Sequence, residues 1–154
     1  MAVRRFSHIA IRVSDLERSR RFYREALEFR ELSELEIQGG PTARWLEKPD
    51  LGLHAVFLER DGTQVEHQVL DLPKPDERAG YNTLGLAHIG LRVDDVETVS
   101  RAVCTHGGSV IERSRYRNEA LGSHVVFVAD PDGTWIELIQ APGDPEVPPG
   151  DALA

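Results

Sequence analysis

The chain has a single cysteine, Cys104, and no apolar run long enough to cross a membrane. One cysteine excludes a disulfide framework within the chain and fits a reducing compartment, so we expect a cytoplasmic protein. A membrane-spanning helix needs about 18 or more consecutive apolar residues. The segment after Met1 alternates apolar and polar residues and does not show the apolar stretch of an export signal. We therefore expect neither a membrane partner nor export.

Basic residues are scarce relative to acidic ones, with 18 Lys and Arg against 26 Asp and Glu and a formal net charge of -8. Nucleic-acid affinity depends on clustered basic residues that displace counterions, and the sequence has no such cluster, so nucleic acid is excluded as an expected partner. At 154 residues the chain buries enough surface to fold without a structural metal. Any metal is therefore expected to serve chemistry.

An internal repeat is the most informative feature that the sequence does contain. Residues 6–17 match residues 86–97, with His8 aligned to His88. Further along, residues 54–58 match residues 124–128, and residues 61–66 match residues 132–137. The first copy is longer in its middle, at 38–49. Two copies of this length predict a pair of modules, because a solenoid needs about three or more repeats.

Each copy has the pattern of a strand, a helix and three further strands. Alternation of apolar and polar residues over 8–13 predicts a half-buried strand. The sequence Ser14-Asp-Leu-Glu17 has the form of a capping box, which predicts that a helix of about twelve residues follows. The remaining predicted strands are 29–37, 52–58 and 63–70 in the first copy, and 109–116, 123–129 and 134–140 in the second.

These patterns predict an α+β fold with two tandem βαβββ modules. We expect the first module at 1–70 and the second at 84–140. A linker is predicted at 71–83, and a Pro-rich tail at 141–154. Because both modules follow one plan, any site built by one should have a counterpart in the other.

The repeat matches His8 with His88 and Glu66 with Glu137, so each module supplies one imidazole and one carboxylate. If the two sheets face each other, these four side chains converge. Two imidazoles and two carboxylates suit one divalent first-row ion, Ni, Co, Zn, Mn or Fe, with positions left for substrate. A shift of one residue in the strand that carries Glu66 would present His67 instead, and both alternatives stay open.

Four further residues are candidates for contact with a small-molecule substrate. Trp135 lies two residues from Glu137 and therefore on the same strand face, where its ring suits a pocket wall. Arg12 and Arg92 share the predicted face of the histidines and suit an anionic substrate. His124 could act as an acid or base if it faces the site, but the sequence pattern does not decide its face.

Three segments of the sequence resemble the vicinal oxygen chelate superfamily, the glyoxalase, bleomycin resistance and dioxygenase group. They are His8-Ile-Ala-Ile-Arg-Val-Ser-Asp15, Ala87-His-Ile-Gly-Leu-Arg-Val-Asp-Asp95 and Phe127-Val-Ala-Asp-Pro-Asp-Gly-Thr-Trp-Ile-Glu-Leu138. The resemblance implies that the modules form an open, barrel-like mixed sheet around one divalent metal ion per site. It also implies that the ligands are His8, Glu66, His88 and Glu137, a pattern similar to that of glyoxalase I and methylmalonyl-CoA epimerase.

The activity that the resemblance implies is that of a metal-dependent lyase or isomerase. Such an enzyme removes a proton next to a chelated carbonyl of a small organic substrate, with Glu137 or Glu66 as the base. One alternative is an Fe(II) extradiol-type dioxygenase that uses His8, His88 and Glu137. Another is a metal-free binding or resistance protein. We expect a homodimer, with sites formed either within one chain or across the dimer.

Overall fold

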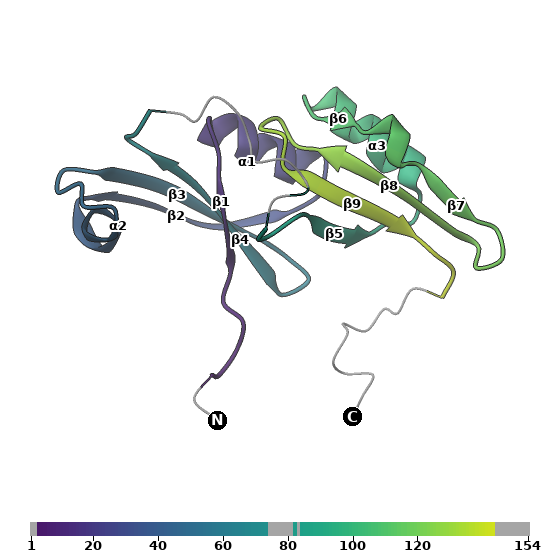
Figure 1. The fold of residues 1–154 in the computed structure, drawn as a ribbon, viewed down its shortest axis with the longest axis horizontal. Helices are drawn as coiled ribbons and strands as arrows, with labels where there is room; N and C mark the ends of the chain where they lie inside the picture. Colours follow the sequence, from purple (N-terminus) through teal and green to yellow (C-terminus); the bar gives the residue numbers. More distant parts are fainter. Residues whose placement is uncertain (1–2, 74–81, 83, 144–154) are drawn as a thin grey trace. The chain divides into compact units, whose positions relative to one another are not determined.

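The computed structural model describes residues 3–73, 82 and 84–143, and the chain divides into two compact units, Met1–Glu77 and Arg78–Ala154. Each unit holds a mixed β-sheet and a ten-residue helix (Figure 1). The predicted α+β class is therefore confirmed. The predicted linker at 71–83 and tail at 141–154 lie mostly outside the described residues. Among the described helices, none has the length and apolar character needed to traverse a bilayer.

The first unit is a four-stranded sheet with the strand order β1-β4-β3-β2 (Figure 1). Strand β1 runs parallel to β4, and the other neighbours are antiparallel. Strands β3 and β4 are joined at Asp61-Gly62, where φ is 51° and 77°, as a tight two-residue hairpin turn requires. The elements are β1 (Ile9–Arg12), α1 (Leu16–Glu25), β2 (Arg30–Gln38), α2 (Gly40–Trp45), β3 (Gly52–Arg60) and β4 (Thr63–Leu70).

The second unit repeats this plan with the strand order β5-β9-β8-β6, and β7 also pairs with β8. Strand β5 runs parallel to β9, as β1 does to β4. The elements are β5 (Ile89–Arg92), α3 (Val96–Thr105), β6 (Ser109–Val110), β7 (Tyr116–Asn118), β8 (Ser123–Ala129) and β9 (Trp135–Gln140). The βαβββ order predicted from the repeat is confirmed in both units, with the second strand of this unit in two pieces.

The predicted strand at 109–116 is wrong as a single element, because the 3₁₀ helix η1 (Glu112–Ser114) separates β6 from β7. The Ser114 hydroxyl accepts a hydrogen bond from the Phe127 backbone N–H at 2.8 Å and donates one to the Ile111 carbonyl at 2.6 Å. The Ile111 N–H donates to the Phe127 carbonyl at 2.9 Å. Both backbone polar groups of Phe127 are therefore satisfied although the strand is interrupted.

We expect Ser114→Ala to lower the free energy of unfolding by about 1–3 kcal/mol, because it leaves the Phe127 N–H without its acceptor. Urea denaturation followed by tryptophan fluorescence measures this difference. Ser109→Ala, at an exposed position in β6, is the control and should stay within about 0.5 kcal/mol of the wild type. Equal stability of the two variants would mean that water replaces the Ser114 hydroxyl.

The helices begin at aspartates, and the predicted capping box was wrong about which residue caps α1. The Asp15 carboxylate accepts a hydrogen bond from the Arg18 backbone N–H at 3.0 Å, and in α3 the Asp95 carboxylate accepts from the Thr98 N–H at 2.6 Å. Ser14 accepts instead from the Arg18 guanidinium at 2.8 Å. Serine and aspartate are equally good capping residues, so adjacent candidates could not be separated by residue type.

Helix α1 packs on one face of the sheet, against β3 and β4. Phe22 and Tyr23 of the helix are fully buried, as are Val56, Leu58 and Val65 of the two strands. His67 is also fully buried on this face, with its ring edge-on to Tyr23 at 4.3 Å between centroids and its Nδ1 3.2 Å from Ser19 Oγ. In the second unit, α3 covers β8 and β9 in the same way. Each sheet therefore has a helix-covered face, and its candidate ligands belong to the other face.

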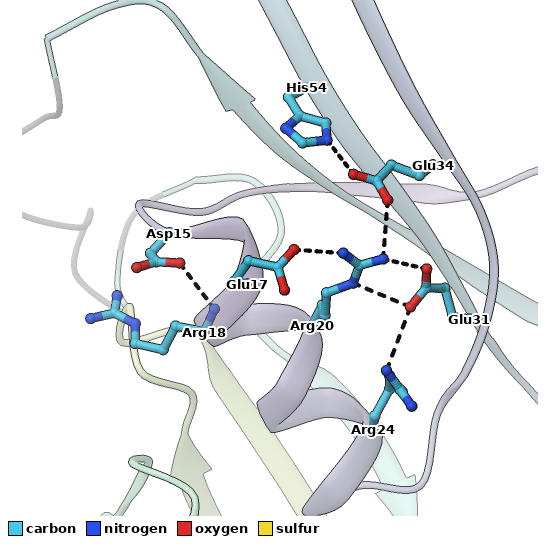
Figure 2. A network of polar contacts seen from close by, with 8 residues as sticks. All are labelled: Asp15, Glu17, Arg18, Arg20, Arg24, Glu31, Glu34 and His54. Atoms are coloured by element: carbon cyan, nitrogen blue, oxygen red, sulfur yellow. Dashed lines mark hydrogen bonds and ion pairs between the residues drawn. The ribbon is translucent and has the colours of Figure 1, made fainter.

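A polar network fastens α1 to the edge strand β2 (Figure 2). Arg20 forms ion pairs with three carboxylates, those of Glu17, Glu31 and Glu34. The Nε2 atom of His54 on β3 lies 2.5 Å from Glu34 Oε1. The hydrogen bond from His54, aided by Arg20, holds the pKa of Glu34 below its ordinary value of 4.5.

Glu34→Gln is expected to lower the melting temperature near neutral pH and to lose this effect in acid. Because the folded-state pKa of Glu34 is lowered, the unfolded chain binds its proton first as the pH falls. The stabilisation is thus present above pH 4.5 and disappears as the pH falls through the folded-state pKa. The melting curves of the two proteins should converge between about pH 7 and about pH 3. A difference in melting temperature that does not change with pH would contradict this expectation. The same pH-dependent difference in the control variant Glu36→Gln would also contradict it.

Candidate metal and substrate site

The first unit brings His8 next to Glu66 on the face that α1 does not cover. The β1–β4 register pairs Ala10 with Glu66, and alternation puts His8 on the same face as Ala10. The Nε2 atom of His8 lies 3.1 Å from Glu66 Oε2, and its Nδ1 lies 3.1 Å from Ser7 Oγ. The ring stands edge-on to Phe57, which is paired with Glu66 across β3 and β4. One imidazole nitrogen therefore faces a carboxylate and the other is held by a hydroxyl.

The second unit builds the same arrangement from its own strands. His88 Nε2 lies 3.3 Å from Glu137 Oε2, and Gly90 is paired with Glu137 as Ala10 is with Glu66. Phe127 on β8 is paired with Glu137 on β9, and the Phe127 ring stands edge-on to His88 with 5.1 Å between centroids. Each unit thus presents one His–Glu pair backed by a phenylalanine.

The register decides between the two neighbouring candidates on β4. Glu66 faces His8, whereas His67 lies on the opposite face in the core beneath α1. The alternative in which His67 replaces Glu66 is therefore not what the structure shows. The carboxylate of Glu66 is nearly buried although it faces away from the helix, with 8% of its side chain exposed against 25% for Glu137.

Two of the predicted substrate contacts in the second unit, Trp135 and His124, lie on opposite faces of its sheet. Trp135 lies on the face of Glu137, and its ring centroid is 5.4 Å from that of Phe127. His124 lies three positions from Phe127 on β8 and so on the other face, together with Val126. Trp135 therefore joins the His88–Glu137 pair, and His124 does not.

Both arginine candidates lie on the faces that carry the His–Glu pairs. Arg12 is two residues from Ala10 in β1, and its guanidinium donates to the Leu70 carbonyl at 3.3 Å. Desolvation by burial lowers the pKa of Arg12. Arg92 is likewise two residues from Gly90 in β5. The Arg12 guanidinium is therefore hydrogen-bonded to the last residue of β4. Both arginines lie on the sheet faces that carry the His–Glu pairs.

The donor chemistry of the two pairs fits a divalent first-row ion. Within residues 3–73, 82 and 84–143, no group of three or more His, Cys, Asp or Glu side chains that could hold a metal is found. Each unit by itself offers two donors, an imidazole nitrogen and a carboxylate oxygen, which are the donor types that Zn, Ni, Co, Mn and Fe accept. The contact of Ser7 with His8 Nδ1 is of the kind that orients a ligating histidine. Each unit thus presents half of the predicted ligand set.

Arg113 is a residue near this site that the sequence patterns missed. It lies in η1, and its guanidinium carbon is 5.7 Å from the centroid of the Trp135 ring. The 3₁₀ helix interrupts a predicted strand, so no alternation marks the position of Arg113. The one available signal was the density of arginines in the segment Arg113-Ser-Arg-Tyr-Arg117.

Residues 5–138 match the family model described as the Glyoxalase/Bleomycin resistance protein/Dioxygenase superfamily. A lactoylglutathione lyase from Haemophilus influenzae is 32% identical over 136 residues, which cover 86% of this chain and 90% of the relative. A lactoylglutathione lyase from Arabidopsis thaliana is 31% identical over 93% of this chain, which spans only 46% of that relative's length. A solved glyoxalase family protein from Bacillus cereus has a TM-score of 0.79 at 15% identity, with 93% of this chain and 99% of that one covered.

Proposed function

The chain belongs to the Glyoxalase/Bleomycin resistance protein/Dioxygenase superfamily, and on this basis we propose that it is a metal-dependent lyase of the glyoxalase type. The proposed substrate is the hemithioacetal of a 2-oxoaldehyde and a thiol. The reaction moves a proton from the carbon that bears sulfur and hydroxyl to the neighbouring carbonyl carbon, the hydroxyl proton passes to the former carbonyl oxygen, and the product is a 2-hydroxy thioester. The relatives named lactoylglutathione lyase support this class of substrate.

The observation that carries the proposal is the His–Glu pair that occurs once in each unit. We propose that His8, Glu66, His88 and Glu137 together are the ligands of one divalent first-row ion. When bound, such an ion chelates two substrate oxygens, draws electron density from the carbonyl and acidifies the adjacent C–H bond. A chain that merely sequesters a small molecule has no need of two matched imidazole and carboxylate pairs.

The side chain that moves the proton must be a carboxylate within reach of the substrate carbon. We assign this role to Glu137, because its side chain is three times as exposed as that of Glu66. A Glu137 oxygen accepts the proton from one carbon and returns it to the next. His88, 3.3 Å away, orients the carboxylate, and Phe127 and Trp135 provide apolar walls that restrict water. Glu66 is the alternative base.

Elemental analysis of protein purified anaerobically, without chelator and without a histidine tag, tests the metal. About one Ni, Co, Zn or Mn ion per four-residue ligand set is expected. The same sample should form a thioester from methylglyoxal and glutathione without oxygen. Iron together with oxygen-dependent ring cleavage would replace the proposal with the dioxygenase alternative. A protein that binds no metal, even after incubation with each ion, would instead be a metal-free binding protein.

Complementation tests whether the ligand set comes from one chain or from two chains of a homodimer. One inactive variant combines His8→Ala with Glu66→Gln, and the other combines His88→Ala with Glu137→Gln. If each ligand set is shared between chains, co-refolding equal amounts of the two variants restores about a quarter of the wild-type sites, because about half of the dimers are then mixed and each mixed dimer holds one intact set of two. No recovery in mixed dimers that are verified by mass would place each set within one chain.

A further inference from the structure

The imidazole of His8 contacts polar and aromatic side chains within the first unit. Its Nδ1 atom lies 3.1 Å from Ser7 Oγ, and its Nε2 atom lies 3.1 Å from Glu66 Oε2. The Phe57 ring stands edge-on to the His8 ring, with 5.6 Å between centroids. Ser7 is the residue directly before His8 and precedes β1. Both ring nitrogens of His8 therefore have a polar partner.

The separation between His8 and Glu66 is that of two ligands of one ion. Donor atoms bound to one ion at about 2.1 Å each lie about 3.0 Å apart at a right angle and about 3.4 Å apart at the tetrahedral angle. The 3.1 Å between His8 Nε2 and Glu66 Oε2 falls in this range. The His8 ring is thus already oriented as a ligand, and Nε2 needs only to exchange a proton for the metal.

Metal binding at Nε2 requires a change of tautomer in His8. A neutral imidazole carries one N–H, and an ionised carboxylate can only accept a hydrogen bond. Without metal, the contact with Glu66 favours the proton on Nε2, and Nδ1 accepts from the Ser7 hydroxyl. With a metal at Nε2, that proton leaves to water, and Nδ1 takes a proton from water and donates it to Ser7 Oγ. The charge of the ring does not change.

A serine hydroxyl serves both tautomers because it can either donate or accept a hydrogen bond. Rotation about its C–O bond exchanges the two roles, so neither the backbone nor the His8 ring has to move. A carbonyl at this position would serve only the tautomer with the proton on Nδ1. In the second unit the residue matched to Ser7 is Ala87, whose methyl side chain cannot form this bond. The hydroxyl therefore belongs to the pair of the first unit.

We propose that Ser7 is a positioning residue that keeps His8 Nε2 directed at the metal while the imidazole changes tautomer. This inference rests on the metal site of the proposed function. A group that holds a ligating histidine by its second nitrogen contributes about 10–100-fold to metal affinity. The Glu66 carboxylate of the same pair is nearly buried, with 8% of its side chain exposed. Ser7 and this burial together make the first unit's pair the more firmly held half of the proposed site.

The zinc affinity of Ser7 variants, measured by competition with a chelator, tests the proposal. Ser7→Ala is expected to bind zinc about tenfold or more weakly than the wild type, because the unbound His8 ring is then free to turn. Ser7→Thr keeps a hydroxyl at the same position and should stay within about threefold of the wild type. The control is Ser33→Ala, at an exposed position on β2 of the same unit, which should stay within about twofold. Wild-type affinity in Ser7→Ala, or an equal loss in Ser33→Ala, would overturn the proposal.

Nitrogen NMR of the histidine imidazoles reads the tautomer directly, with the His8 signals assigned by comparison with His8→Ala. In the wild type the proton should be on Nε2 without metal and on Nδ1 with zinc. Nuclear Overhauser contacts between the His8 and Phe57 rings should be the same in both states. In Ser7→Ala these contacts should differ between the two states. A change of these contacts in the wild type when zinc binds would show that the ring turns, and the proposed role of Ser7 would be wrong.

Neither measurement needs turnover, which separates the role of Ser7 from the proposed activity. A wild type that binds zinc but converts no hemithioacetal would remove the lyase activity, and the Ser7 variants would still decide the role of Ser7. A wild type that binds no divalent metal would overturn both. Ser7→Ala should keep the wild-type melting temperature within a few degrees, because Ser7 is exposed, so that a loss of zinc affinity does not arise from unfolding.

Discussion

Glu137→Gln should lower kcat by about 10²–10⁴-fold, the usual contribution of a general base. The amide has nearly the shape of the carboxylate but cannot take a proton from the substrate carbon. The side chain is a quarter exposed, so the substitution leaves the sheet packing around Ile136 and Leu138 intact. Steady-state kinetics with the methylglyoxal–glutathione adduct measures kcat, and metal content is measured on the same sample, because Glu137 is also a proposed ligand.

Glu119→Gln is the control for this substitution. Glu119 is exposed and lies in the same unit, between β7 and β8. Its replacement by glutamine removes one negative charge, as Glu137→Gln does. It should keep wild-type kcat, and both variants should keep the wild-type melting temperature within a few degrees. If Glu66→Gln abolished turnover while Glu137→Gln with full metal retained it, the proton acceptor would be Glu66.

His8→Ala and His88→Ala are each expected to weaken metal binding by more than about 100-fold. Loss of a group that only hydrogen-bonds to a metal ligand weakens binding by up to about 100-fold, and loss of the ligand itself should cost more. Each change removes one of four proposed donors and leaves its carboxylate partner without an imidazole. The repeat offers matched controls in His54 and His124. His54 contacts Glu34 on the helix-covered face, and His124 lies on that face of the second sheet. Their alanine variants should bind metal as the wild type does.

Competition with a chromogenic chelator measures these affinities without reference to turnover. Wild-type affinity in His8→Ala and His88→Ala would remove the metal-site proposal. A different pattern would favour another chemistry: loss of affinity in His8→Ala, His88→Ala and Glu137→Gln with full affinity in Glu66→Gln indicates two histidines and one carboxylate. That donor set is typical of Fe(II) oxygenases.

The repeat carried most of the fold prediction, because a match in residue type at the same place in two copies is stronger than either copy alone. Its value for the site came from the sheet topology that it implies. His8 and Glu66 are far apart in sequence, and they meet because the first and last strands of the module run parallel side by side. The same pairing brings His88 to Glu137. How the two pairs combine stays a prediction.

What the sequence did not reveal depends on hydrogen bonds between distant segments. Nothing in the alternation of 109–116 shows that the Ser114 hydroxyl accepts from the Phe127 N–H, and this bond stabilises the 3₁₀ helix that carries Arg113. The face of His124 likewise required the β8–β9 register. Strand alternation alone did not decide whether Glu66 or His67 is the ligand on β4, and the register with β1 was needed to choose Glu66.

The turns of the two equivalent hairpins differ in length by one residue. Glu66 follows its cross-strand partner Phe57 by nine positions and Glu137 follows Phe127 by ten, yet each glutamate lies beside its histidine. The extra residue is taken up in the turn, because the parallel pairing with β1 or β5 fixes the register of the last strand. A shift of β4 itself would push the Glu66 carboxylate into the apolar packing around Tyr23, where an unpaired charge is costly. Descendants of this chain, natural or selected from a library, should therefore vary this turn in length while they keep the register between the first and last strands.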